Sequence, residues 1–283
     1  MLDADDKKKI IAQTKDILRD GCTNLKVYVN DDPDHDFLMR YLLNVRKYFK
    51  EIFLVGPGLV FSDRKVADFV VDQRINISFP LYGSRPEIHD LITGRAGSFS
   101  RLMDDASYIK SRGTSHISLY TMILKQNLDD IPEIFSLCND ELGLNMNSVS
   151  LPDLLENHRN HWNDFFVDFI KVRDCILSIK FSKRTITSIP PCIFSDDDLH
   201  KLENIWFDTT VSAVRVSELK DDSHPESVFW RKSRQCGCDR CHLHFAGICD
   251  GIPEEYFRLN EGFRFNPVSE KTFIDRPMLF RKD

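Results

Sequence analysis

Residues 25–55 read LKVYVNDDPDHDFLMRYLLNVRKYFKEIFLV, and the order of their apolar runs predicts a fold class. The stretch begins with the run Leu25–Val29 and ends with the run Glu51–Val55. Between the two runs, apolar residues recur from Phe37 to Phe49 at the spacing of a helix face that packs on a sheet. Strand, helix and strand in this order form a βα unit, in which the two strands pair in parallel.

The same alternation continues through the first 150 residues. Apolar runs predict further strands at Ile75–Phe79, His116–Leu124 and Leu144–Val149, and amphipathic segments separate them. With right-handed crossovers, this order predicts an α/β fold with a curved parallel sheet or an incomplete (β/α) barrel. Ligands of such sheets bind at the C-terminal ends of the strands.

A helical pattern also precedes the first predicted strand, with Ile10, Thr14 and Ile17 on one face. In a βα succession this helix implies a strand before it, so the chain resembles one that is cut at its start. Without that strand, Leu25–Val29 is either an exposed sheet edge or an edge covered by another segment. Natural sheets avoid exposed edges.

Composition excludes several classes of protein. The 283 residues include 44 acidic and 38 basic side chains, which gives a formal net charge of −6. No long basic tract is present, so we expect no nucleic-acid partner. No apolar signal segment or membrane-spanning run is present either, and the sequence therefore predicts a cytoplasmic protein without membrane contact.

Eight cysteines are present, and five of them are candidate metal ligands because they fall in the last third of the chain. These five are Cys192, Cys236, Cys238, Cys241 and Cys249. In a reducing compartment such crowding favours a metal site over disulfides. His242 and His244 lie close enough to replace a cysteine in a zinc site, so spacing alone does not separate zinc from an iron–sulfur cluster.

Several motifs resemble those of radical SAM enzymes. Residues 77–83 (ISFPLYG) and 87–99 (EIHDLITGRAGSF) are similar to the fourth strand of that family and the loop after it. Residues 121–133 and Glu141-Leu-Gly143 are similar to the fifth strand, its helix and the entry to the sixth strand. Pro191-Cys192 and Cys238-x2-Cys241-x7-Cys249-Asp-Gly251 resemble the SPASM or twitch-type region, which holds an auxiliary cluster.

The resemblance covers roughly residues 10 to 270 and implies a partial radical SAM-like barrel over 1–189 and an auxiliary-cluster region over 190–283. It implies a 4Fe-4S cluster held by Cys192, Cys238, Cys241 and Cys249, with Cys236 as a spare thiol or as the replacement for Cys192. It also implies S-adenosylmethionine as a cofactor and a peptide or small molecule as the substrate.

By the same resemblance, Ser78 and Asn127 match positions that contact the nucleoside of S-adenosylmethionine. Asp31 and Asp32 stand where the family carries the Gly-Gly-Glu segment that binds the methionine ammonium, and either carboxylate can accept that hydrogen bond. Taken as plain structure, Ser78 and Asn127 are polar groups that cap turns at the ends of strands.

The Cys-x3-Cys-x2-Cys loop that holds the radical-generating cluster of the family is missing from this sequence, in which Cys22 stands alone. Two explanations stay open: a piece of a longer enzyme, or a degenerate relative that makes no radical. The sequence leaves catalysis itself open. The alternative function is a non-catalytic β/α module that carries a structural zinc site and binds a peptide or a partner chain.

Four further predictions concern local structure. His89 and Asp90 are either an acid–base pair or the residues that order their loop. Ser150 and Asp153 predict the start of one helix that buries apolar residues as far as Phe169. Residues 176–189 predict one or two short strands, and Cys22, Cys138 and Cys175 are expected to be small core residues.

Overall fold

The computed structural model describes residues 4–29, 33–113, 116–152, 162–207, 214–215, 232–233, 240–241, 243, 252–253 and 259–280. The chain divides into two compact units. Unit 1 consists of Met1–Leu81, Arg85–Tyr120 and Ser212–His224. Unit 2 consists of Tyr82–Ser84, Thr121–Val211 and Pro225–Asp283. Strand β4 (Ile117–Met122) therefore begins in unit 1 and ends in unit 2.

Unit 1 is built on parallel strands in the order β4-β3-β2-β1-β8. Its strands besides β4 are β1 (Asn24–Tyr28), β2 (Glu51–Val55), β3 (Asn76–Pro80) and β8 (Val214–Arg215). Its helical elements are α1 (Ala4–Arg19), α2 (His35–Val45), η1 (Gly58–Ser62), α3 (Arg64–Asp72), α4 (Pro86–Thr93) and α5 (Ser98–Arg112). The predicted order of strands and helices is confirmed.

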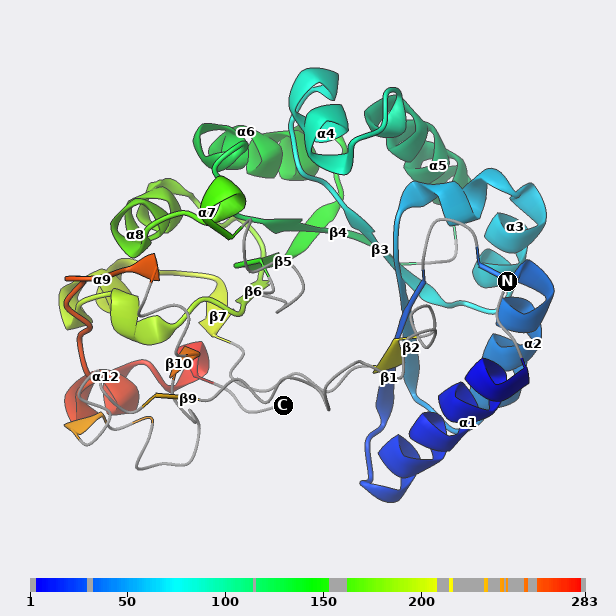
Figure 1. Ribbon diagram of the computed structural model, residues 1–283, viewed down its shortest axis with the longest axis horizontal. Helices are drawn as coiled ribbons and strands as arrows, with labels where there is room; N and C mark the ends of the chain where they lie inside the picture. Colours follow the sequence, from blue (N-terminus) through cyan, green and yellow to red (C-terminus); the bar gives the residue numbers. More distant parts are fainter. Residues whose placement is uncertain are drawn as a thin grey trace. The chain divides into compact units, whose positions relative to one another are not determined.

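The strand register separates an apolar face of this sheet from a more polar one. Val27, Leu54 and Ile77 are neighbours across β1, β2 and β3, and all three are fully buried. Because side chains alternate along a strand, the next residue of each strand points to the opposite face. That second row contains Ser78 and Ser118, which pair across β3 and β4. The helices α1, α2, α3 and α5 lie along one side of the strands (Figure 1).

Short polar residues and glycines set the helix ends of unit 1. The Asp34 carboxylate accepts a hydrogen bond from the Phe37 backbone N–H, which caps α2. Gly94 has a φ of 68° at the end of α4, and Gly97 has a φ of 80° immediately before α5. Both angles lie in the left-handed region that glycine adopts without strain. The helix α5 accordingly begins at Ser98, directly after this turn.

The open edge of β1 is covered by a segment from late in the chain. Val27 pairs with Val214 and Tyr28 pairs with Arg215, both in parallel. Of the two alternatives predicted for this edge, the structure therefore shows coverage by another segment. Figure 1 shows this short yellow arrow beside β1.

Unit 2 continues the parallel arrangement with β5 (Asn145–Ser150), β6 (Thr185–Thr187) and β7 (Ile205–Phe207). Its helical elements are η2 (Leu128–Asp130), α6 (Ile131–Ser136), η3 (Leu137–Glu141), α7 (Trp162–Phe165), α8 (Phe169–Ser178), η5 (Pro191–Ile193), α9 (Asp196–Lys201), α12 (Glu270–Asp275) and η7 (Pro277–Leu279). Residues 176–189 contribute one strand, β6. Since β7 pairs with β6, the parallel strands continue past residue 189, where the sequence places the start of the C-terminal region.

The single helix predicted up to Phe169 is wrong in its last part. The helix α7 ends at Phe165, and a new helix, α8, begins at Phe169. Asp168 has an extended backbone, with φ −64° and ψ 151°, and its side chain accepts a hydrogen bond from the Lys171 N–H. This N-cap interrupts the helix, although the apolar spacing runs on through the break.

From β1 to β7, the strands follow one another in a single parallel order, and helical segments connect them. This is the arrangement of an incomplete (β/α) barrel, and the predicted α/β fold class is confirmed. A second, antiparallel pair joins β9 (Lys232–Ser233) to β10 (Ile252–Pro253). None of the helices in the described part of the chain combines the length and the hydropathy that crossing a bilayer requires.

Candidate functional site

Ser78 lies in the middle of β3 and is 4% exposed. Its neighbours in the register are Val55 on β2 and Ser118 on β4. The Ser118 hydroxyl donates a hydrogen bond to the Ile77 carbonyl at 3.2 Å. Two serines thus stand side by side on the more polar face of the sheet, and sequence reasoning identified the first of them.

Asn127 is 1% exposed and uses its side-chain amide to shape the loop after β4. Its Oδ1 accepts a hydrogen bond from Leu124 N at 2.8 Å. Its Nδ2 donates to the carbonyls of Tyr82 at 3.0 Å and Met122 at 2.9 Å. Both amide hydrogens are therefore taken by backbone groups, which leaves one lone pair on Oδ1 for any further partner. This is the turn-capping role that was the structural alternative for Asn127.

Asp130 is a second residue that ties these loops together, and sequence reasoning missed it. Its carboxylate accepts hydrogen bonds from Ser84 N at 2.6 Å and from the Ser84 hydroxyl at 2.7 Å. With the bond from Asn127 to Tyr82, this contact fixes residues 82–84 against the loop that follows β4. The rim of unit 2 at the ends of these strands is consequently held by charge-assisted hydrogen bonds, which are stronger than neutral ones.

Asp31 and Asp32, the predicted ammonium ligands, lie outside the described residues. The described residues that follow them form one ion pair and one hydrogen bond between side chains. Lys7 Nζ lies 2.7 Å from Asp34 Oδ2, and this hydrogen bond is the main cause that lowers the pKa of Asp34. His35 Nδ1 lies 3.1 Å from Asp63 Oδ2, which joins the first turn of α2 to the N-cap of α3.

His89 and Asp90 lie in α4, and Asp90 orders the turn between α4 and α5, which fits the structural alternative for this pair. The Asp90 carboxylate accepts hydrogen bonds from Gly97 N at 2.6 Å, Phe99 N at 2.8 Å and the Ser98 hydroxyl at 2.8 Å. These bonds, first among them that of Phe99, lower the pKa of Asp90. His89 is 2% exposed, and burial lowers its pKa to about 4. A neutral, buried imidazole is poorly placed to exchange protons with a substrate.

The candidate metal ligands are described in part. Cys192 lies in η5 and is half-buried, and Cys241 is 7% exposed. Cys236, Cys238 and Cys249, with His242 and His244, lie outside the described residues. Among the residues that are described, no three potential ligands of the His, Cys, Asp and Glu types come together. The donor chemistry of Cys192 and Cys241 suits zinc and iron–sulfur clusters alike.

Two of the predicted core cysteines behave as core thiols. Burial raises the pKa of Cys138 and that of Cys175 to about 12. Both therefore stay protonated at neutral pH, and a protonated thiol is neither a nucleophile nor a metal ligand. Cys22 is half-buried beside the start of β1.

The residues on either side of the cysteine-rich segment pair with each other. Ser233 of β9 pairs with Ile252 of β10, and Lys232 pairs with Pro253. The stretch 234–251, with four of the five candidate ligands, is thus closed into a loop.

Further along the chain, a second contact joins the tail to Cys192. Asn266 N donates a hydrogen bond to the Cys192 carbonyl at 2.8 Å. The Asn260 side-chain oxygen accepts one from Phe169 N at 2.7 Å, and the rings of Phe263 and Phe265 pack edge-on against Phe169. The segment that follows the cysteines is therefore anchored beside Cys192 and at the start of α8.

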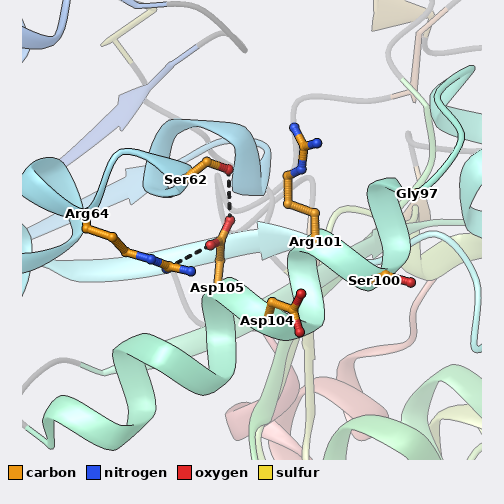
Figure 2. Close-up of a pocket in the computed structure, with 7 residues that line it drawn as sticks. All are labelled: Ser62, Arg64, Gly97, Ser100, Arg101, Asp104 and Asp105. Atoms are coloured by element: carbon orange, nitrogen blue, oxygen red, sulfur yellow. Dashed lines mark hydrogen bonds and ion pairs between the residues drawn. The ribbon is translucent and has the colours of Figure 1, made fainter.

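A hollow of about 370 Å³ opens in unit 1 near the first turns of α3 and α5 (Figure 2). Its lining residues are Ser62, Arg64, Gly97, Ser100, Arg101, Asp104 and Asp105. The Asp105 side chain is 2% exposed and accepts hydrogen bonds from Arg64 Nη1 at 2.9 Å and from the Ser62 hydroxyl at 3.4 Å. Burial raises the pKa of Asp105, and the charge of Arg64 is the main opposing cause.

The charges around the hollow cancel. Arg64 neutralises Asp105, and Arg101 and Asp104 add one charge of each sign. Arg64 is further held by the ring of Tyr108, whose centroid lies 4.1 Å from the guanidinium carbon. The hollow offers no net charge to an ionic ligand, and we interpret its polar residues as the link between α5 and the segment η1–α3.

Comparisons of this chain with known proteins found similar folds among solved structures. No family model matches the chain, and no curated protein matches it significantly. The FeFe-hydrogenase maturase HydG from Carboxydothermus hydrogenoformans matches with 14% identity over 72% of this chain and 51% of that chain, at a TM-score of 0.48. Streptococcus suis SuiB bound to the precursor peptide SuiA matches with 12% identity over 59% of this chain and 48% of that chain, at a TM-score of 0.37.

SuiB bound to S-adenosylmethionine matches with 12% identity over 57% of this chain and 48% of that chain, at a TM-score of 0.39. The chain spans about half the length of the solved structures it matches.

Proposed function

We propose that this chain is a radical SAM-like protein that holds a 4Fe-4S cluster with cysteines of its C-terminal region. The proposed ligands are Cys192, Cys238, Cys241 and Cys249, and Cys236 is the spare thiol or the replacement for Cys192. The cluster would supply an anchoring point for a substrate or a relay for an electron. The protein's own share is to position these thiolates and to shield them from water.

The observation that carries the proposal is the pairing of β9 with β10 around the cysteine-rich stretch. Closing a loop of this length costs roughly 3 kcal/mol of chain entropy. A ladder of two residues returns about 1–2 kcal/mol, since each hydrogen bond is worth about 1 kcal/mol net. A closed loop with four cysteines therefore needs a further source of cohesion, and a shared metal centre is one that its residues can provide.

Two observations, one at Cys192 and one around Cys241, support the same proposal. The carbonyl of Cys192 accepts the Asn266 N–H, so the tail that follows the loop returns to the proposed ligand outside it. Cys241 and Leu243 are buried, which is the environment that protects a cluster from oxidation.

For S-adenosylmethionine, the described residues fit less well. Both amide hydrogens of Asn127 are used within the protein, so this residue has no donor for a nucleoside. Ser78 lies on the polar face of the sheet and keeps its place in the proposal, as do Asp31 and Asp32.

The substrate in this proposal is a peptide or a small molecule, as the family resemblance implies. The net charge of −6 disfavours nucleic acid, because a protein of this charge repels phosphates.

Anaerobic reconstitution with iron and sulfide, followed by metal analysis, tests the proposal. We expect roughly four irons per chain and an absorption band from thiolate-to-iron charge transfer. Cys241→Ser should lower the iron content by more than half. The same loss in Cys192→Ser identifies Cys192 as the fourth ligand, and the same loss in Cys236→Ser identifies Cys236 as its replacement. Cys175→Ser is the matched control, because its thiol is held protonated by burial and should leave the iron content unchanged.

Two outcomes decide against the proposal. One zinc per chain, lost in Cys241→Ser, favours the alternative of a partner-binding module with a structural zinc site. Chains that take up no metal at all exclude both functions. Cleavage of S-adenosylmethionine by the reconstituted chain would reveal a second cluster that the proposed ligand set does not include.

A further inference from the structure

The tail that follows the cysteine-rich segment makes a tight turn that starts at Asn260. Phe263 N donates a hydrogen bond to Asn260 O at 2.9 Å, and Gly262 has a φ of 84°. A positive φ at the third residue of a turn favours glycine or asparagine. The turn brings the rings of Phe263 and Phe265 onto the ring of Phe169, with centroid distances of 5.5 Å and 5.6 Å.

The side chain of Asn260 caps α8 from this turn. Its buried Oδ1 accepts a hydrogen bond at 2.7 Å from Phe169 N, the first N–H of α8. Asp168, the N-cap of the helix, accepts the Lys171 N–H instead. The first N–H groups of a helix have no partner within the helix, so each of these two side chains supplies one that the other does not. The start of α8 is therefore fastened to the tail.

The same tail also holds the backbone of Cys192. Asn266 N donates to the Cys192 carbonyl at 2.8 Å, and η5, which carries Cys192, lies against α8. Pro191 and Ile193, the other residues of η5, are buried. The tail is thus fixed at two points on two neighbouring elements, by Asn260 on α8 and by Asn266 on η5. These two bonds tie the backbone of Cys192 to the chain that continues from the cysteine-rich segment.

We infer that Asn260 is a positioning residue of the metal centre, which acts through the tail on Cys192 and makes Cys192, rather than Cys236, the fourth ligand. The inference rests on the proposed function, because it needs the shared metal centre. A ligand that is fixed before the metal binds loses less conformational freedom on binding, and the complex is correspondingly tighter. Replacing a residue that orients a metal ligand typically lowers metal affinity by about ten- to hundredfold.

The first test measures how fast the anaerobically reconstituted chain loses its iron to excess EDTA, followed by the thiolate-to-iron absorption. Asn260→Leu removes the acceptor with little change in size and should speed the loss of iron roughly tenfold. Asn260→Asp keeps an oxygen acceptor for Phe169 N, and its rate should therefore stay close to that of the wild type. Thr185→Val is the control for stability alone, because it removes another buried hydrogen bond of unit 2, from Thr185 Oγ1 to the Met146 carbonyl. Its rate should be unchanged.

A second pair of variants alters the turn without touching a hydrogen-bonding side chain. Among the described residues, no atom lies within 4 Å of the place that a Cβ would take at Gly262. Gly262→Ala strains the turn through its backbone, and Gly262→Asn does so less, because asparagine adopts positive φ more readily. Iron loss should be about threefold faster in Gly262→Ala and near the wild-type rate in Gly262→Asn. This pair tests the inference even if Asn260→Leu does not fold.

A double variant tests whether Asn260 acts through Cys192. In Cys192→Ser, the ligand that Asn260 positions is gone. Adding Asn260→Leu to Cys192→Ser should therefore change the rate at which the remaining iron is lost by less than about twofold, because two residues that act through one interaction are not additive.

The outcomes separate this inference from the proposed function. A wild-type chain that takes up no iron would overturn both. Iron uptake with equal release rates in wild type and Asn260→Leu would overturn the inference alone. Equal acceleration in Thr185→Val would reduce the role of Asn260 to general stability, and a full effect of Asn260→Leu in Cys192→Ser would show that Asn260 acts elsewhere. Either result contradicts the inference.

Discussion

At the scale of single residues, Asn127 holds the loop after β4 with three side-chain hydrogen bonds. Asn127→Ala removes three hydrogen bonds and leaves the Tyr82 and Met122 carbonyls without this donor inside the protein. We expect the free energy of unfolding to fall by about 2–4 kcal/mol in urea denaturation. The control is Gln126→Ala, because this exposed neighbour makes one long contact of 3.5 Å with the Asp164 carbonyl. An equal loss in both variants would contradict the role of Asn127 in the loop.

His89 predicts a pH dependence of stability. Histidine has a pKa near 6.5 in an unfolded chain, and burial lowers the pKa of folded His89 to about 4. Because the folded pKa is lower, the unfolded state takes up the proton first as the pH falls. Stability is therefore lost as the pH falls from about 6.5 towards about 4, by about 2–3 kcal/mol at pH 4.5. In urea titrations, the difference between wild type and His89→Gln should shrink by this amount between pH 7 and pH 4.5. Parallel curves would refute the prediction.

Residue roles differ in how far the sequence reveals them. The family resemblance singled out Asn127, and the structure adds that its side-chain amide forms hydrogen bonds with backbone groups. Asp130 carried no local signal, because its partner Ser84 lies 46 positions away and no sequence period connects them. For Asp90, the sequence left two roles open, because a carboxylate seven residues before a glycine can either cap a turn or contact a substrate. The hydrogen bond from Gly97 N shows that Asp90 caps the turn.

At the scale of elements, the pair of Arg64 and Asp105 joins α5 to α3. Arg64→Leu leaves the buried Asp105 carboxylate with the hydrogen bond from the Ser62 hydroxyl at 3.4 Å and the weaker influence of the Arg101 charge. The Asp105 side chain is buried, but Arg64 is 46% exposed, so solvent screens part of the pair and breaking it should cost about 1–3 kcal/mol. We expect this loss in urea denaturation, and Asp105→Asn in the same chain should recover at least half of it.

Arg101→Leu is the control for the element scale, because Arg101 is an exposed arginine of the same hollow. It should change the free energy of unfolding by less than about 0.5 kcal/mol. If Arg64→Leu behaves like Arg101→Leu, the pair does not join the helices.

Long periodic elements could be predicted, and short ones could not. The strand predicted at Glu51–Val55 is observed with the same bounds, because a buried parallel strand is a continuous apolar run. The break at Asp168 was missed, since the apolar spacing of the helix continues across it. Strands β8, β9 and β10 have two residues each, which is too short for any period.

At the scale of the whole molecule, the fold class followed from the order of elements, but the division into two units did not. The division passes through β4, between Tyr120 and Thr121, within one continuous strand. Neither composition nor turn residues mark this boundary, because it depends on which strands pair with β4 before and after Tyr120.

The proposed metal centre predicts a local response to chelation. Removing the metal should loosen the loop that β9 and β10 close and leave the sheet of unit 1 unchanged. Hydrogen exchange with mass spectrometry should therefore show faster exchange at residues 240–243 and 252–253 of the chelated protein, and no change at β1, β2 and β3. A uniform response over both units, or no response, would contradict a metal centre confined to the C-terminal region.

The central claim is that the C-terminal thiolates share one iron–sulfur cluster. Iron K-edge X-ray absorption on the anaerobically reconstituted chain tests it most directly, because scattering between neighbouring irons requires several irons in one centre. The account predicts sulfur and iron neighbours around each iron, and loss of both in Cys241→Ser but not in Cys175→Ser. Isolated metal ions with no metal neighbour, or the same spectrum in Cys241→Ser, would contradict it.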